Sequence, residues 1–256
     1  MPAQLSGLVT RLRAAGCVFA EDEAALLEEE AGTTDELEAM VRRRVAGEPL
    51  EQILGWAEFC GLRVVVEPGV FVPRRRTELM VTEAVRLVPP TGVPVVVDLC
   101  CGSGAVGAAI AAALGAVEMY AADLDPAAVR CARRNLDPAR VFEGDLFDAL
   151  PSSLRGRVDV LAVNTPYVPS DAIATMPPEA RNHEPALALD GGVDGLTVAC
   201  RVAAGAPDWL RAGGAVLVET SRTQATVLAE VFASHGLAAR VATSEDLDAT
   251  LVIGAT

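Results

Sequence analysis

Residues 93 to 256 alternate between short runs of β-branched residues and longer stretches of small apolar residues. The run Val95-Val96-Val97 has no polar interruption and is closed by a glycine turn, which is typical of a buried parallel strand. Small residues from 105 to 113 then predict a helix that packs closely on the sheet. Further strands are expected over 119–123, 141–145, 158–163, 213–220, 240–243 and 249–254, and helices over 79–87, 127–135, 195–203 and 224–235. The pattern predicts an α/β fold whose seven-stranded sheet closes with a hairpin.

The chain before residue 76 follows a different pattern. Apolar residues recur with helical spacing in three short pieces between residues 5 and 46, and Thr34 and Asp35 are the expected N-caps of the third piece. Residues 55–72 alternate like a β-hairpin, with Glu67-Pro68-Gly69 as its turn. We therefore expect an N-terminal helical domain over 1–54, a β-hairpin linker over 55–75 and the α/β domain over 76–256.

Composition narrows the class of protein. A chain of 256 residues with 51% hydrophobic content can bury a large core, no apolar run reaches membrane-spanning length, and the start lacks a signal-peptide pattern, so we expect a cytoplasmic protein. The net charge of −14 argues against affinity for nucleic-acid phosphates, and all 21 basic residues are arginine. Six cysteines without a C-x-x-C pair or histidine partners predict buried hydrophobic residues, and neither a disulfide framework nor a metal site.

The glycine-rich turn after the first strand of the α/β domain predicts a nucleotide cradle. Gly102, Gly104 and Gly107 satisfy the G-x-G-x-x-G dinucleotide fingerprint, which alone is a weak signal. Asp98 at the strand end discriminates, because a carboxylate repels a pyrophosphate and attracts a cationic sulfonium and amino group. The turn therefore favours S-adenosylmethionine over NAD.

Carboxylates also follow the next two predicted strands. Asp123 lies 19 positions after Gly104, at the distance where such folds hydrogen-bond a ribose hydroxyl pair. Asp145 ends the third strand, where it can accept a hydrogen bond from an adenine amino group. Aspartates at the carboxyl ends of successive parallel strands predict one shared cofactor site.

The fourth strand runs into the sequence Asn164-Thr165-Pro166-Tyr167. An asparagine oxygen and a neighbouring backbone carbonyl can together accept both hydrogens of a planar NH₂ group, and a ring such as Tyr167 can line the slot. Amide or aromatic nitrogen is a poor nucleophile because its lone pair is delocalised, so fixing both N–H bonds and aiming the nitrogen at the methyl group would be most of the catalysis. Thr165 precedes proline and is held in extended geometry.

Taken together, the motifs resemble the HemK/PrmC family of protein-(glutamine-N5) methyltransferases over nearly the whole chain. The motifs that carry the resemblance are G-E-P-x-x-Q-x-x-G (47–55), V-P-R-x-x-T-E (72–78), D-x-x-x-G-x-G (98–104), N-x-P-Y (164–167) and H-E-P (183–185). The resemblance implies a Rossmann-like class I S-adenosylmethionine-dependent fold. It also implies methyl transfer to a glutamine amide of a protein, such as a peptide chain release factor or a ribosomal protein, with S-adenosyl-L-homocysteine as the second product. No direct nucleic-acid or membrane partner is expected, and we expect a monomer.

The resemblance also assigns site residues. Catalytic roles fall on Asn164, Thr165, Pro166 and Tyr167. Cofactor contacts fall on Asp98, Cys100, Gly102, Gly104, Asp123, Leu124, Asp145, Leu146 and Asn164. Substrate contacts fall on Arg74, Thr77 and Glu184.

Two departures from the family pattern point to a divergent relative. Thr165 stands where the family usually has the first proline of N-P-P-Y, and Arg75 and Arg76 replace a proline and an acidic residue. Two alternatives stay open: a methyltransferase acting on exocyclic amines of nucleic acid, and an inactive S-adenosylmethionine-binding interaction module. An NAD-dependent dehydrogenase is a more distant alternative.

Overall fold

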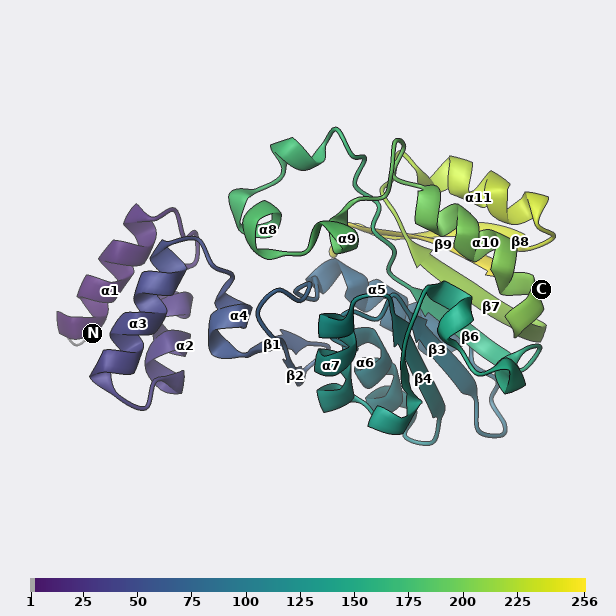
Figure 1. Cartoon of the computed structure of the whole chain (residues 1–256), viewed down its shortest axis with the longest axis horizontal. Helices are drawn as coiled ribbons and strands as arrows, with labels where there is room; N and C mark the ends of the chain where they lie inside the picture. Colours follow the sequence, from purple (N-terminus) through teal and green to yellow (C-terminus); the bar gives the residue numbers. More distant parts are fainter. Residues whose placement is uncertain (1–2) are drawn as a thin grey trace.

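The computed structural model describes residues 3–256, beginning with a helical head (Figure 1). Helices α1 (Ala3–Ala14), α2 (Ala20–Glu30) and α3 (Thr34–Val45) confirm the three predicted pieces. They pack around a core of their own that includes Leu12 and Leu27.

Two details of the head differ from the sequence-based expectation. The N-cap of α3 is Thr33, whose side chain accepts a hydrogen bond from the amide of Glu36, because Thr33 is extended while Thr34 and Asp35 are already helical. Helix α4 (Leu50–Leu54) was not predicted, since five residues are too few for a helical period to show.

The hairpin is formed by antiparallel strands β1 (Trp56–Phe59) and β2 (Leu62–Val65). Its turn is Cys60-Gly61, where both residues have positive φ (52° and 75°), as a tight two-residue hairpin turn requires. Glu67-Pro68-Gly69 does form a turn, in which the amide of Val70 donates to the carbonyl of Glu67 at 3.1 Å, but the prediction that it is the turn of the hairpin is wrong. Cys60 is exposed in the turn, so the expectation that every cysteine is a buried hydrophobic residue is wrong at this position.

The main sheet of the described chain has seven strands in the order β5-β4-β3-β6-β7-β9-β8, which confirms the predicted α/β fold. Strands β5, β4, β3, β6 and β7 are parallel to one another. Strand β9 pairs antiparallel with β7 on one side and with β8 on the other, and β8 and β9 form the closing hairpin. The strands span Val95–Leu99 (β3), Glu118–Asp123 (β4), Val141–Glu143 (β5), Val158–Val163 (β6), Leu210–Glu219 (β7), Ala238–Ser244 (β8) and Ala249–Ala255 (β9).

Helices cover both faces of this sheet (Figure 1). Val97 and Leu99 pack in one core with α10 (Thr197–Trp209) and α11 (Ala225–Ser234), while Val96 packs in another with α5 (Glu78–Leu87) and α6 (Ala105–Leu114). Helix α7 (Pro126–Asn135) packs beside β4 and β5. Burial of both faces explains why the strands are apolar at successive positions.

The segment between β6 and α10 contacts the helical head. The sequence pattern predicts a loop over residues 171–189, but this stretch contains α8 (Pro178–His183) and α9 (Ala186–Leu189). Arg44 of the head makes an ion pair with Glu179 of α8 at 3.3 Å, and Gln52 donates to the carbonyl of His183 at 3.4 Å. These contacts tie α8 to the head.

Candidate active site

A cavity of about 440 Å³ lies at the carboxyl edge of the sheet. Residues that follow β3, β4, β5 and β6 line it, together with the segment before α5 and helix α9. The strand order reverses between β3 and β6, and ligands of open parallel sheets bind at such a switch point.

Asp98 lines the inner end of this cavity. One of its oxygens, Oδ2, accepts a hydrogen bond from the amide of Gly107 at 2.8 Å, which fixes α6 against the strand. A Cβ on Gly107 would lie 3.2 Å from the same oxygen, so a glycine permits this close approach. Burial, and to a lesser degree the nearby Asp123, raises the pKa of Asp98 to about 8. A cation bound here would favour the carboxylate form.

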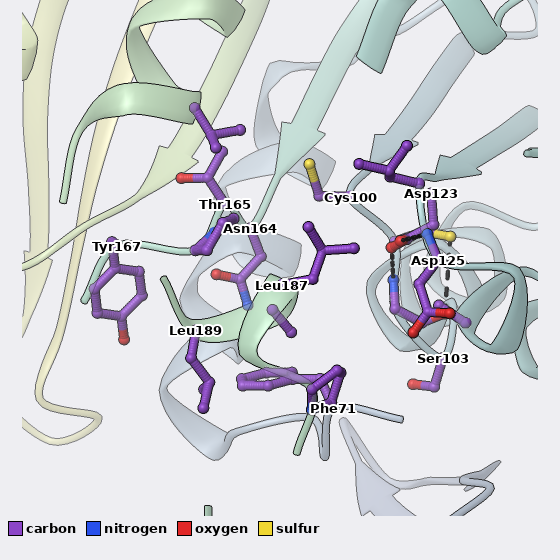
Figure 2. A pocket seen from close by; sticks show the side chains of 18 of the residues that line it. Phe71, Cys100, Ser103, Asp123, Asp125, Asn164, Thr165, Tyr167, Leu187 and Leu189 are labelled. Carbon is purple, nitrogen blue, oxygen red and sulfur yellow. Dashed lines mark hydrogen bonds between the residues drawn. The ribbon is translucent and has the colours of Figure 1, made fainter. Parts of the chain in front are cut away.

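Asp123 at the end of β4 orders the glycine turn. Its two oxygens accept from the amides of Gly102 at 2.8 Å and of Asp125 at 2.9 Å (Figure 2). Burial raises the pKa of this carboxyl group. Each carboxylate oxygen has a second lone pair, so Asp123 retains acceptor capacity toward a ligand in the cavity.

The other predicted cofactor residues divide into two groups. Cys100, Leu124 and Leu146 line the cavity, as do Asp98, Gly102 and Asp123. Gly104 is absent from the lining and serves packing: its φ is 77°, and a Cβ there would lie 3.0 Å from Leu136.

Asp145 lines the cavity with a partner that the sequence did not reveal. Its Oδ2 accepts from the guanidinium of Arg201 in α10 at 2.8 Å. Any ligand amino group at Asp145 would therefore share this carboxylate with Arg201, which also lines the cavity.

The Asn164-to-Tyr167 segment lies across the cavity from Asp123 and Asp125 (Figure 2). The Asn164 carboxamide points into the cavity, and within residues 3–256 neither it nor the Thr165 carbonyl takes part in a hydrogen bond. Pro166 also lines the cavity. Two acceptors without partners, on adjacent residues of one wall, suit a ligand that brings two N–H donors.

Tyr167 is held from behind by β7. Its hydroxyl donates to Oε1 of Glu219, at 3.4 Å. Burial, followed by the charge of Glu219, raises the pKa of the phenol to about 12, so this hydroxyl keeps its proton at neutral pH. Tyr167 is therefore a neutral wall of the cavity.

Two of the three predicted substrate residues, Arg74 and Thr77, line the cavity. Glu184 does not; it accepts from Arg74 at 2.6 Å and 2.7 Å and from the amide of Val72 at 3.2 Å. Burial raises the pKa of Glu184. The arrangement gives Glu184 the task of positioning Arg74.

Several lining residues had no sequence signal of their own. Phe71, Leu187 and Leu189 supply apolar surface beside Asn164 (Figure 2), and the guanidinium of Arg74 lies 4.9 Å from the centre of the Phe71 ring. The short helix α9 that carries both leucines falls in the stretch predicted as a loop. Only the fold brings these residues to the part of the cavity beside Asn164, Thr165 and Tyr167, which we call the slot.

Within the part of the chain that the structure describes, no group of three or more His, Cys, Asp or Glu side chains is arranged to hold a metal ion. The described helices also include none that is both long and apolar enough to span a bilayer.

Comparison with known proteins agrees with this geometry. A family model described as "Methyltransferase small domain" matches residues 61–178. A methyltransferase structure from Pyrococcus furiosus superimposes with a TM-score of 0.57 at 18% identity, covering 76% of this chain and 89% of that one. The fold and the site define a Rossmann-like class I S-adenosylmethionine-dependent methyltransferase.

Sequence relatives narrow the class. The release factor glutamine methyltransferase of Geobacter sulfurreducens is 39% identical over 201 residues, which cover 77% of this chain and 69% of that protein. The 4-amino-L-phenylalanine/4-methylamino-L-phenylalanine methyltransferase of Streptomyces pristinaespiralis is 37% identical over 203 residues, with the same coverage of 77% and 69%. The chain belongs to the HemK/PrmC family of protein-(glutamine-N5) methyltransferases.

Proposed function

We propose that this enzyme transfers a methyl group from S-adenosylmethionine to the side-chain amide nitrogen of a glutamine in a protein. The observation that carries the proposal is that Asn164 and Thr165, adjacent residues lining the cavity, each have an acceptor without a hydrogen-bond partner in the described chain: the Asn164 carboxamide oxygen and the Thr165 carbonyl. A primary amide offers two coplanar N–H donors, which match two such acceptors.

The cofactor would occupy the half of the cavity lined by the aspartates. Asp98 offers a carboxylate to the cationic amino acid end, and Asp123 and Asp145 offer acceptors to the ribose and the adenine. A cavity of about 440 Å³ falls within the range usual for ligands of this size. When bound, S-adenosylmethionine supplies an electrophilic methyl group.

The protein's own residues supply orientation. An amide nitrogen is weakly nucleophilic, and accepting both of its hydrogens at Asn164 and Thr165 would fix the amide plane, so that one face of the nitrogen can be held toward the half of the cavity that the cofactor would occupy. The nitrogen gains a bond to the methyl carbon, the sulfur–carbon bond breaks, and the nitrogen then releases one proton. The apolar surface of Phe71, Leu187 and Leu189 limits the access of water to the slot.

The substrate that we infer is a peptide chain release factor. The Geobacter sulfurreducens relative is named for this substrate. The protein's net charge of −14 favours a protein substrate over nucleic acid.

The test incubates the purified enzyme with tritium-labelled S-adenosylmethionine and purified release factors, followed by peptide mapping. We expect label on one glutamine, and no label when that glutamine is replaced by alanine. Label on DNA with none on protein would contradict the proposal and support the nucleic-acid alternative. Binding of S-adenosylhomocysteine without transfer to any substrate would support the inactive module.

A second candidate rests on the Streptomyces pristinaespiralis relative, whose name specifies an aromatic amine of a free amino acid. An aniline nitrogen also carries two N–H donors and a delocalised lone pair, so the same two acceptors would fit it. Methylation of 4-amino-L-phenylalanine, with none of release factors, would favour this candidate.

A further inference from the structure

Two residues hold Tyr167 in place. They are Glu219, the last residue of β7, and Gln224, the residue before α11. Gln224 Nε2 donates to the Tyr167 carbonyl at 2.9 Å and to the Asp194 carbonyl at 2.8 Å. Its Oε1 accepts from the Ser221 hydroxyl at 2.6 Å. Gln224 thus fixes the backbone at Tyr167, and both its amide nitrogen and its amide oxygen take part in hydrogen bonds.

Glu219 is different, because its bonding is incomplete. The side chain is 2% exposed, and its Oε2 has no hydrogen-bond partner in the described chain. Oε1 accepts the Tyr167 hydroxyl at 3.4 Å and lies 3.8 Å from Nε of Arg76. A buried carboxylate with such long contacts costs stability, and an apolar side chain would complete β7 with less cost.

The position of Glu219 joins segments that are far apart in sequence. Arg76 and Thr77 belong to the segment before α5, and the Thr77 hydroxyl lies near Glu219 without a hydrogen bond of ordinary geometry. Thr77 and Tyr167 both line the cavity, while Glu219 does not. Glu219 can therefore act on the slot only through residues in front of it, and the side chains that face it are Thr77, Arg76, Tyr167 and, further away, Arg74.

We propose that Glu219 is a positioning residue of the methyl-transfer reaction, whose carboxylate orients the Tyr167 hydroxyl and the Arg76 guanidinium so that the Tyr167 ring forms the wall of the amide slot. This inference rests on the proposed function. It also explains why Arg76 stands beside the slot, since its charge balances a carboxylate buried behind the wall. We expect these long contacts to shorten when a substrate binds beside Tyr167.

The first test does not need the substrate. The chain has two tyrosines, so Tyr120→Phe leaves Tyr167 as the only one, and tyrosine labelled with ¹³C at Cζ reports on its hydroxyl. Because burial raises the pKa of Glu219, we expect the Tyr167 signal to shift as pH rises, with a midpoint above the ordinary range for glutamate. Glu219→Gln should abolish the shift.

Glu83→Gln is the matched control, because Glu83 is another buried glutamate, paired with Arg86 and Arg240 away from the slot. The control should keep the Tyr167 titration. A titration that persists in the Glu219→Gln protein, or that is absent from the protein with Glu219 intact, would overturn the proposal. Thermal melting of each variant confirms that it is folded at the temperature of the measurement.

The second test measures turnover with a purified release factor. Glu219→Gln should lower kcat at least tenfold while the Kd for S-adenosylmethionine stays within twofold, and Glu83→Gln should leave both unchanged. Tyr167→Phe combined with Glu219→Gln should be no more than twofold slower than the slower single variant, since both remove one link. Independent, multiplying losses would contradict the proposal. If no release factor is methylated by the unmodified enzyme, the proposed function fails, and the Tyr167 titration alone decides the link.

Discussion

The buried hydroxyl of Thr165 allows a sharp test of how the slot is built. Thr165 is 2% exposed, and its Oγ1 has no hydrogen-bond partner within residues 3–256. Leaving a buried donor unpaired costs about 1–3 kcal/mol. Thr165→Val keeps the branched shape and removes the hydroxyl, so we expect the free energy of unfolding to rise by about 1–3 kcal/mol. For a chain of this size that corresponds to about 3 °C in Tm per kcal/mol.

Urea unfolding and thermal melting measure this change, and Thr220→Val is the matched control. Thr220 is also buried, but its hydroxyl donates to Gln224 Oε1 at 3.1 Å, so the same substitution there should destabilise the protein by about 1 kcal/mol. Methyl transfer should survive Thr165→Val, because the proposed acceptor is the backbone carbonyl. Destabilisation by Thr165→Val as large as by Thr220→Val would refute the claim that the hydroxyl is unpaired.

Three further predictions follow from the site and the head. Asn164→Ala should lower the transfer rate at least tenfold while calorimetry shows the cofactor Kd nearly unchanged; an unchanged rate would remove Asn164 from the mechanism. Burial raises the pKa of Asp98 to about 8, so the affinity for the cationic cofactor should increase about tenfold for each pH unit as pH rises toward 8. Over the same change, from about pH 4 to pH 8, the free energy of unfolding of the protein without cofactor should fall. A pH-independent Kd would contradict this. Arg44→Met removes the ion-pair partner of the buried Glu23 and should destabilise the protein by about 3 kcal/mol, measured by thermal melting. Arg11→Met, which breaks the exposed pair with Glu38, should cost under about 1 kcal/mol in the same measurement.

The sequence predicted those parts of the fold that depend on local pattern. Strand β6 was predicted over 158–163 and is found there, because Arg157 precedes it, Asn164 follows it and only Asp159 interrupts its apolar residues. The hairpin turn was misplaced because Glu67-Pro68-Gly69 carries the stronger composition signal, while Cys60-Gly61 succeeds through backbone geometry that a cysteine rarely adopts. Local pattern thus ranks candidate turns without deciding between them.

Pairings across long sequence separations were beyond the sequence. The sequence motifs assigned both Arg74 and Glu184 to the substrate, but did not show that the two residues, 110 positions apart, contact each other. In the structure Glu184 holds Arg74 in place. Arg201 beside Asp145 and Glu219 behind Tyr167 had no motif at all, because each acts through a partner that only the sheet topology brings near.

The strength of the slot comes from the number of segments that converge on it. A weak amide nucleophile gains little from any single group, so its reactivity depends on how closely the acceptors and walls hold their positions. Asn164 directly follows β6, and Glu184 fixes Arg74. Glu219 and Gln224 hold the hydroxyl and the carbonyl of Tyr167. Under the proposed function, Thr165 would contribute only its backbone carbonyl, whose direction the following proline restricts, so we expect a threonine at this position to be compatible with methyl transfer.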